Sequence, residues 1–289
     1  MTRFTYARPE TMDDLLGLLN EHGPAARLLA GGTDLTVRLR SGKDLPGIVV
    51  DLKRVGAIRA DILEHGSFLR IGARAVMTGI MENPFVRRIF PALAESAAVV
   101  GSVQIRNRAT LAGNICNASP AADTAPALMV YGAVAGIVGM SGSRRVPLTE
   151  FFVGPGRTVL KQGEIVEFID IPFPSAPCGS AFGRITRRRG VDLATINLCC
   201  LVNSSGQTFF AYGAVGPRPF IVRDESGILA NPAVSHAERD IALNRLIAQA
   251  TPRTDVRGSR DYRQAMLLVM SRRSLTTAIM RLHSGLETQ

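Results

Sequence analysis

The chain has 289 residues, of which 46% are hydrophobic and 20% charged. This composition is typical of a globular protein with a sizeable core, and no apolar run reaches the roughly 18–20 residues that a membrane-spanning helix needs. The formal net charge is +10, but no aromatic residues are interleaved with the basic ones as in nucleic-acid-binding surfaces. Nucleic acid, an acidic partner and an anionic cofactor could each explain this charge, and we favour an acidic partner subunit.

The cysteine pattern bears on cellular location and on metal binding. Cys116, Cys178, Cys199 and Cys200 form no C-x-x-C pair. This spacing favours reduced or buried thiols in a cytosolic protein over an iron–sulphur or zinc site in this chain. The first residues also lack the apolar segment of a signal peptide. We expect a cytoplasmic protein without a metal of its own.

The first part of the chain predicts a compact strand–helix–strand unit. Thr11 is the expected N-cap of a helix that ends at Gly23-Pro24. Buried strands are expected at 27–30 and 48–52, with a helix at 33–40 between them. The turn before that helix lacks the G-x-G-x-x-G spacing of a nicotinamide-binding fold.

The middle of the chain mixes both kinds of element, which indicates an α+β subdomain. Strands are expected at 67–72, 134–138, 145–147 and 165–171, and helices at 91–99 and 125–131. A proline-rich stretch at 172–177 is a poor helix and a poor central strand, so we place a domain boundary there. Beyond it we expect strands at 194–203 and 208–215, then helices at 237–249 and 262–283.

The segment 105–127 is the most informative part of the sequence. Its small residues Ala112-Gly113-Asn114 predict a turn, and Asn117, Ser119 and Asp123 follow closely. Small side chains let backbone N–H groups approach an anion. A second small-residue turn, Leu-Ala-Gly-Gly-Thr-Asp-Leu, occupies residues 29–35. Either turn alone is more simply a connection between a strand and a helix, but the two together favour one long anionic ligand.

These motifs resemble a known family. The sequence A-G-G-T-D-L at 30–35 and Q-I-R-N-x-A-T-x-x-G-N-I-C-N-x-S-P-x-x-D at 104–123 are similar to those of the FAD-binding medium subunit of the molybdenum hydroxylases, above all of bacterial xanthine dehydrogenases. The segment 182–189 resembles a third family motif. The resemblance implies an α+β fold with a vanillyl-alcohol-oxidase/PCMH-type FAD-binding unit of two subdomains, 1–55 and 56–175. A CO dehydrogenase flavoprotein C-terminal-like α/β domain, 178–289, would follow.

The resemblance also implies a set of cofactor-binding residues. The residues that would wrap the pyrophosphate of FAD are Leu29, Ala30, Gly31, Gly32, Thr33, Asp34 and Leu35. A carboxylate beside a phosphate would be repelled, so Asp34 would contribute its backbone N–H or point away. In the second motif Thr110, Gly113 and Asn114 would contact phosphate and flavin beside Ser119, and Asp123 would accept a hydrogen bond from a ribitol or ribose hydroxyl. Val100, Gly101, Cys116 and Val166 match positions near the flavin or adenine, and ordinary core packing explains them equally well.

Two positions depart from the family pattern. Ala112 stands where the family usually has glycine, which is tolerable if its φ is negative and strained if it is positive. Arg184 stands where relatives often carry lysine. An arginine keeps the positive charge with a different donor geometry, so it would stabilise a reduced anionic flavin or would be surface charge.

By resemblance, the chain is an electron-transfer subunit. A large subunit with the molybdenum cofactor would hydroxylate the substrate, and a small subunit with two [2Fe–2S] clusters would pass electrons to FAD here, and then to NAD+ or another acceptor. A dimer of such heterotrimers is expected. The chain lacks the cysteine-rich insertion of the 4-hydroxybenzoyl-CoA reductase type.

No protein acid, base or nucleophile is evident in the sequence, so we expect the flavin to carry the chemistry. Two alternatives stay open. One is a basic binding module without a redox role. The other is a stand-alone flavin oxidase of the same fold, although no histidine for covalent flavin attachment lies near Gly31 and Gly32.

Overall fold

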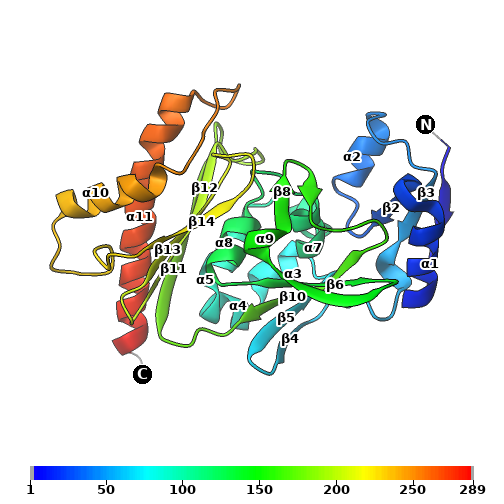
Figure 1. Cartoon of the computed structure of the whole chain (residues 1–289), viewed down its shortest axis with the longest axis horizontal. Coiled ribbons are helices and arrows are strands. Elements are labelled where there is room, and N and C mark those ends of the chain that lie inside the picture. The colour runs from blue at the N-terminus through cyan, green and yellow to red at the C-terminus, as the bar shows by residue number, and fades with distance from the viewer. Residues whose placement is uncertain (1–2, 288–289) are drawn as a thin grey trace.

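The computed structural model describes residues 3–287, so the outermost residues of the predicted ranges 1–55 and 178–289 lie outside it. Three larger sheets follow one another along the long axis of the molecule (Figure 1), and β8 (Phe152–Gly154) and β9 (Arg157–Thr158) form a fourth, two-stranded sheet. The N-terminal sheet lies at one end, a five-stranded sheet lies in the centre, and a four-stranded sheet lies at the other end. This mixed architecture confirms the predicted α+β class.

The N-terminal sheet is parallel and has the order β1-β3-β2. Its strands are β1 (Thr5–Ala7), β2 (Ala26–Leu29) and β3 (Ile48–Asp51), and the central strand β3 is fully buried. Helix α1 (Met12–His22) begins after Thr11, whose hydroxyl accepts the Asp14 N–H at 3.1 Å as predicted. After a 3-10 turn, η1 (Gly23–Ala25), and β2, the chain enters the short helix α2 (Leu35–Arg40). The loop between β2 and α2 is the first small-residue motif.

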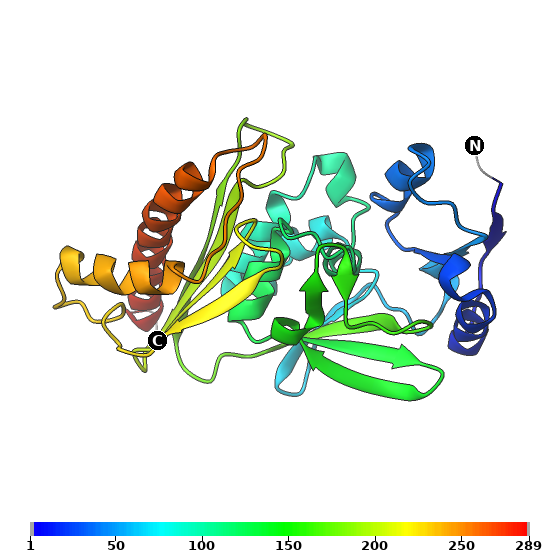
Figure 2. The ribbon, with the colours of Figure 1, turned by 45° about the horizontal axis from the view of Figure 1, so that its top comes forward.

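The central sheet is antiparallel, in the order β4-β5-β10-β6-β7. Its strands are β4 (Ile62–His65), β5 (Phe68–Gly72), β10 (Ile165–Pro172), β6 (Val134–Gly139) and β7 (Gly142–Pro147). Helices α3 (Met77–Glu82), α4 (Pro84–Ile89), α5 (Pro91–Ala98) and α8 (Thr124–Val130) pack above it (Figure 2). Short elements complete this part: η2 (Leu52–Arg54), α6 (Val103–Arg106), α7 (Leu111–Cys116), α9 (Leu148–Phe151), β8 (Phe152–Gly154) and β9 (Arg157–Thr158).

The third sheet is antiparallel in chain order and consists of β11 (Cys178–Ile185), β12 (Ile196–Asn203), β13 (Thr208–Gly213) and β14 (Phe220–Asp224). The long helix α11 (Arg260–Glu287) packs on one face with α10 (His236–Ile247) beside it, and α8 packs on the other. Cys200 belongs to the core under α11, whereas Cys199 belongs to the core shared with the central part. Burial on both faces explains why β12 contains an apolar run at 198–202.

Most of the predicted helices and strands are confirmed, but several strands were missed, of which β11 matters most for the site. Its residues Gly179 and Gly183 face α11, and a Cβ on Gly179 would lie 2.0 Å from the carbonyl oxygen of Ala278. The strand therefore needs glycine where a strand pattern would show an apolar side chain. That close helix contact hides β11 from a search for alternating hydrophobic residues.

Candidate functional site

A cavity of about 620 Å³ lies where the three parts of the fold meet. The loop after β2 and helix α7 line one end, and the start of β10 adds Ile165 and Val166. The other end is lined by Arg184 on β11 and by the loop that leads from β11 to β12. The C-terminal sheet thus contributes to the cavity directly, although the two small-residue motifs both precede it in the sequence.

The loop after β2 presents a row of backbone donors. Within residues 3–287, no backbone carbonyl accepts the N–H groups of Gly32, Thr33, Asp34 or Leu35. Gly32 has a φ of +77°, a left-handed conformation that glycine adopts without strain. Successive free N–H groups in such a loop make a concave site for an anion. This geometry suits a phosphate group, as predicted from the sequence.

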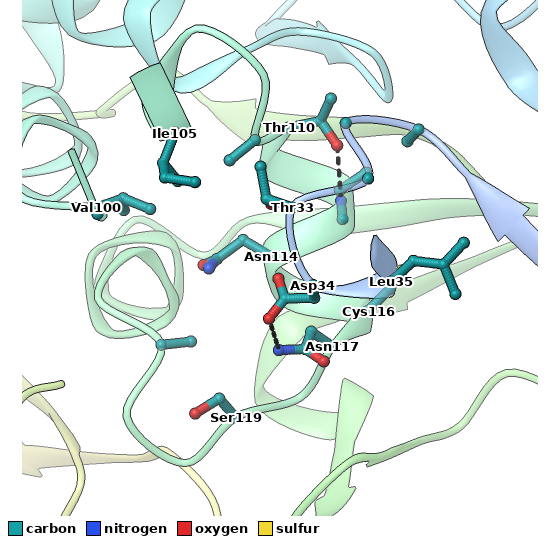
Figure 3. Close-up of a pocket in the computed structure, with 18 of the residues that line it drawn as sticks. Thr33, Asp34, Leu35, Val100, Ile105, Thr110, Asn114, Cys116, Asn117 and Ser119 are labelled. Atoms are coloured by element: carbon teal, nitrogen blue, oxygen red, sulfur yellow. Dashed lines mark hydrogen bonds between the residues drawn. The ribbon is translucent and has the colours of Figure 1, made fainter. Parts of the chain in front are cut away.

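The second motif differs from its prediction in one respect. The residues Ala112-Gly113-Asn114 form no turn but belong to helix α7, whose N-cap is Thr110. The Thr110 hydroxyl accepts the Gly113 N–H at 3.1 Å (Figure 3). A Cβ on Gly113 would lie 2.8 Å from that hydroxyl, so glycine preserves the cap. The turn was predicted because a helix of small and polar residues lacks an apolar stripe.

Ala112 is buried in this helix and is unstrained. Among the described residues other than glycine, only Ala118 and Ala214 have a positive φ. An alanine at position 112 therefore fits without the conformational strain that a positive φ would bring. The departure from the family's glycine leaves the local backbone intact.

A polar link joins the two motifs across the edge of the cavity. The Asp34 carboxylate accepts a hydrogen bond from the Asn117 amide at 3.2 Å (Figure 3). The oxygen of that amide accepts a hydrogen bond from Arg38 on α2. The Asp34 carboxylate is thus engaged with a protein group of the second motif.

The opposite end of the cavity holds a buried carboxylate. Asp123 is 7% exposed, and its Oδ1 lies 3.3 Å from Nε of Arg184 and accepts the Asn197 amide at 2.9 Å. Burial raises the pKa of Asp123 to about 6, against the lowering effects of the Arg184 charge and the Asn197 hydrogen bond. Arg184 is largely buried and also donates to the carbonyl oxygens of Val99 and Asp192. It is therefore not a surface charge.

Every predicted cofactor-binding residue lines this cavity except Leu29, whose neighbour Leu28 takes that place. Burial raises the pKa of the Cys116 thiol to about 12, so this lining group stays protonated. Sequence reasoning missed the loop residues Val191, Asp192 and Leu193, which directly follow the predicted arginine motif. It also missed Asn197, whose role depends on a contact between two distant segments.

The described residues contain no group of three or more His, Cys, Asp or Glu side chains placed to hold a metal ion. Nor does the described part of the chain include a helix with the length and apolarity for crossing a membrane. The lining of the cavity includes backbone hydrogen-bond donors, the ion pair of Arg184 and Asp123, and apolar groups. These are groups for holding a ligand.

Comparison with protein families gives two matches that together cover most of the chain. A family described as "FAD binding domain in molybdopterin dehydrogenase" matches residues 2–174. A second, described as "CO dehydrogenase flavoprotein C-terminal domain", matches residues 181–278.

Relatives and solved structures match over nearly the full length. The xanthine dehydrogenase FAD-binding subunit of Escherichia coli O157:H7 is 31% identical over 280 residues, covering 95% of this chain and 96% of the relative. The carbon monoxide dehydrogenase medium chain of Hydrogenophaga pseudoflava is 31% identical over 280 residues, covering 96% and 97%. A solved structure of carbon monoxide dehydrogenase from Hydrogenophaga pseudoflava superimposes with a TM-score of 0.88 at 31% identity, covering 96% of this chain and 98% of that one.

Proposed function

The chain belongs to the family of FAD-binding subunits of molybdenum-containing dehydrogenases, and from this premise we propose that it is the electron-transfer subunit of a heteromeric, xanthine dehydrogenase-like molybdenum hydroxylase. Electrons enter from [2Fe–2S] clusters of a small partner subunit and leave to NAD+ or another acceptor. A large partner subunit holds the molybdenum cofactor and hydroxylates the substrate. The three chains form a heterotrimer that pairs with a second copy, in the cytoplasm.

The observation that carries this proposal is the arrangement of donors and acceptors along one cavity. Free N–H groups from Gly32 to Leu35 suit the pyrophosphate of FAD, because they supply several hydrogen-bond donors in succession. At the far end, Asp123 lines the cavity as an acceptor for a hydroxyl group. A dinucleotide carries both kinds of group, so the residues fit FAD.

Bound FAD supplies the chemistry of accepting and releasing electrons, and the protein binds and orients it. Arg184 is held in place by Val99, Asp192 and Asp123, so its positive charge stays fixed at this end of the cavity. A fixed cation stabilises negative charge that develops on a neighbouring ligand. We assign Arg184 this role toward the reduced flavin. The predicted ranges 1–55, 56–175 and 178–289 remain our proposal for the domain limits.

The first test is the visible absorption spectrum of the purified chain, with release and chromatographic identification of its chromophore. We expect FAD in near-stoichiometric amount and no iron–sulphur absorbance. A folded, colourless chain that takes up no added FAD would overturn the proposal and favour the basic binding module. Anaerobic addition of NADH then tests the acceptor, because electron transfer to NAD+ is reversible. Flavin bleaching by NADH supports NAD+, whereas bleaching by dithionite alone indicates another acceptor.

The partner requirement is tested in the same preparation. The proposed electron donor is an iron–sulphur subunit, so reduced [2Fe–2S] protein from a matching complex should bleach the flavin rapidly. Candidate purines, aldehydes and N-heteroaromatic compounds should leave the flavin of the isolated chain oxidised. Reduction by one of these small molecules without partners would instead favour the stand-alone oxidase.

A further inference from the structure

Asn197, at the start of β12, contacts residues that line the proposed cofactor site. Its side chain is fully buried, and the amide nitrogen donates to Oδ1 of Asp123 at 2.9 Å and to the carbonyl oxygen of Ala121 at 3.3 Å. Asn197 itself does not line the cavity, whereas Asp123 and Ala121 do. The amide therefore joins the C-terminal sheet to the segment that carries the buried carboxylate.

The fold accommodates this amide at some expense to its stability. Oδ1 of Asn197 is buried and has no hydrogen-bond partner among the described residues, which is unfavourable for a polar atom. Gly213 lies opposite Asn197 in the sheet, and a Cβ there would fall 2.1 Å from that oxygen. Glycine at position 213 thus leaves space for the Asn197 amide, whose nitrogen is hydrogen-bonded and whose oxygen is not. An apolar side chain of similar size would avoid the unpaired acceptor, so the hydrogen bond to Asp123 is the feature that the amide provides.

The contacts of Asp123 leave part of its carboxylate free for a ligand. Asn197 and Arg184 both approach Oδ1, and no side chain within the described residues donates to Oδ2. Because Asp123 lines the cavity, its second oxygen is available to groups placed there. An ionised carboxylate accepts hydroxyl hydrogen bonds more strongly than a protonated one does.

We propose that Asn197 is a positioning residue for the cofactor: it holds Asp123 ionised and oriented, so that the free oxygen accepts hydrogen bonds from hydroxyl groups of bound FAD. This inference rests on the function proposed above. Arg184 on β11 is the charged group that faces Asp123. Elsewhere the cavity is lined by the charged residues Arg27, Asp34, Arg38, Asp44, Arg188 and Asp192.

The proposal predicts a pH dependence of FAD binding. Burial, opposed by Arg184 and Asn197, places the pKa of Asp123 at about 6. FAD affinity should fall as the pH drops through this pKa, because protonation weakens the carboxylate as an acceptor. Removing the Asn197 donor withdraws one of the two groups that favour the ionised form. In a variant without this donor, the fall in FAD affinity should begin at a higher pH than in the wild type.

The experiment measures FAD dissociation constants by flavin fluorescence from about pH 5 to about pH 8 in the full chain. In Asn197→Leu we expect the midpoint of the pH dependence to rise by about one unit. The affinity relative to the wild type should then fall by about twofold near neutral pH and by roughly tenfold near pH 5. Asn197→Asp, which places a second carboxylate beside Asp123, should move the midpoint further in the same direction. In Asp123→Asn, the pH dependence around pH 6 should disappear.

Thr208→Val is the matched control. Thr208 lies in the same sheet, is fully buried, and its hydroxyl also lacks a partner among the described residues, but it does not line the cavity. The Thr208→Val variant should bind FAD with the affinity and pH dependence of the wild type. A wild-type chain that binds no FAD at any pH would overturn both proposals. Normal wild-type binding with an unchanged affinity and midpoint in Asn197→Leu would overturn only the role of Asn197.

Discussion

The backbone of Gly31 lies directly against that of Arg108, since a Cβ on Gly31 would fall 2.0 Å from the Arg108 carbonyl oxygen. Gly31 belongs to the loop after β2, and Arg108 lies two residues before Thr110, the N-cap of α7. The two small-residue motifs are therefore in backbone contact. Glycine at position 31 is required by this contact between protein segments, in addition to any approach of a phosphate.

Gly31→Ala should disrupt the contact between the motifs. No flexible side chain can yield to the added methyl group, because its nearest neighbours are backbone atoms of Arg108 and Ala109. We expect the free energy of unfolding in urea to fall by about 1–3 kcal/mol, as for other overpacked sites, together with weakened FAD binding. Gly56→Ala is the control, because a Cβ there meets nothing within 4 Å. Equal stability of the two variants would argue against the contact.

This contact shows how far the sequence could predict the site. The two small-residue motifs were identified because small residues in sequence are a local signal, and the resemblance to a known family supplied the residues assigned to the cofactor. The reason for Gly31 was not predictable, because it depends on a carbonyl group that is distant in the sequence. Asn197 and Leu28 were missed on similar grounds: each reads as an ordinary member of a strand, and only packing places it beside the cavity.

Gly32→Ala tests the proposed contact of the loop after β2 with a phosphate, separately from the effect of the substitution on stability. Gly32 has a φ of +77° and Gly42 a φ of +69°, so alanine at either position brings similar backbone strain of about 1–2 kcal/mol. At Gly32 the added Cβ also falls 2.8 Å from the end of the Leu29 side chain, which must shift. Only Gly32 lines the cavity. We expect comparable losses of unfolding free energy but a clear loss of FAD affinity in Gly32→Ala alone, measured by fluorescence titration. A similar FAD affinity in both variants would contradict the role assigned to this loop.

Glu95 on α5 should matter more than an ordinary surface carboxylate. It accepts the N–H of Phe182 on the edge strand β11 at 3.1 Å and also pairs with Arg281 on α11. Because the carboxylate serves both a backbone group and a cation, we expect Glu95→Ala to lower the free energy of unfolding by about 1–2 kcal/mol. Asp240→Ala removes a more ordinary ion pair with Arg272 on the same helix, and should lose about 0–1 kcal/mol.

Urea unfolding of Glu95→Ala and Asp240→Ala tests whether Glu95 contributes more to stability than an ordinary ion pair does. Equal losses would mean that the Phe182 N–H finds another partner when Glu95 is removed. The same edge strand was not predicted from the sequence, since its glycines at 179 and 183 serve a close helix contact. Its fixed position matters for the site because Arg184 follows on the same strand.

The last prediction concerns the stability of the chain without FAD. The folded-state pKa of Asp123 is about 6, above the usual aspartate value of 3.8, because burial disfavours the charged carboxylate. Between these values the folded chain binds a proton that the unfolded chain has released. The contribution of Asp123 to stability is therefore complete below about pH 4 and is lost as the pH rises to about 6, by up to about 3 kcal/mol.

Asp123→Asn should remove this dependence, which is read from the difference between wild-type and variant unfolding free energies at a series of pH values. Asp170, buried between Arg70 and Arg145, contributes to stability with the opposite pH dependence. Despite its burial, hydrogen bonds and charges from these arginines hold its pKa below the usual value, so its contribution is present above about pH 4 and lost in acid. A difference curve for Asp123→Asn that is flat from about pH 4 to about pH 6 would contradict the raised pKa. If the curve slopes as expected, the carboxylate that lowers the stability of the FAD-free chain at neutral pH is the one that we propose to bind FAD in its ionised form.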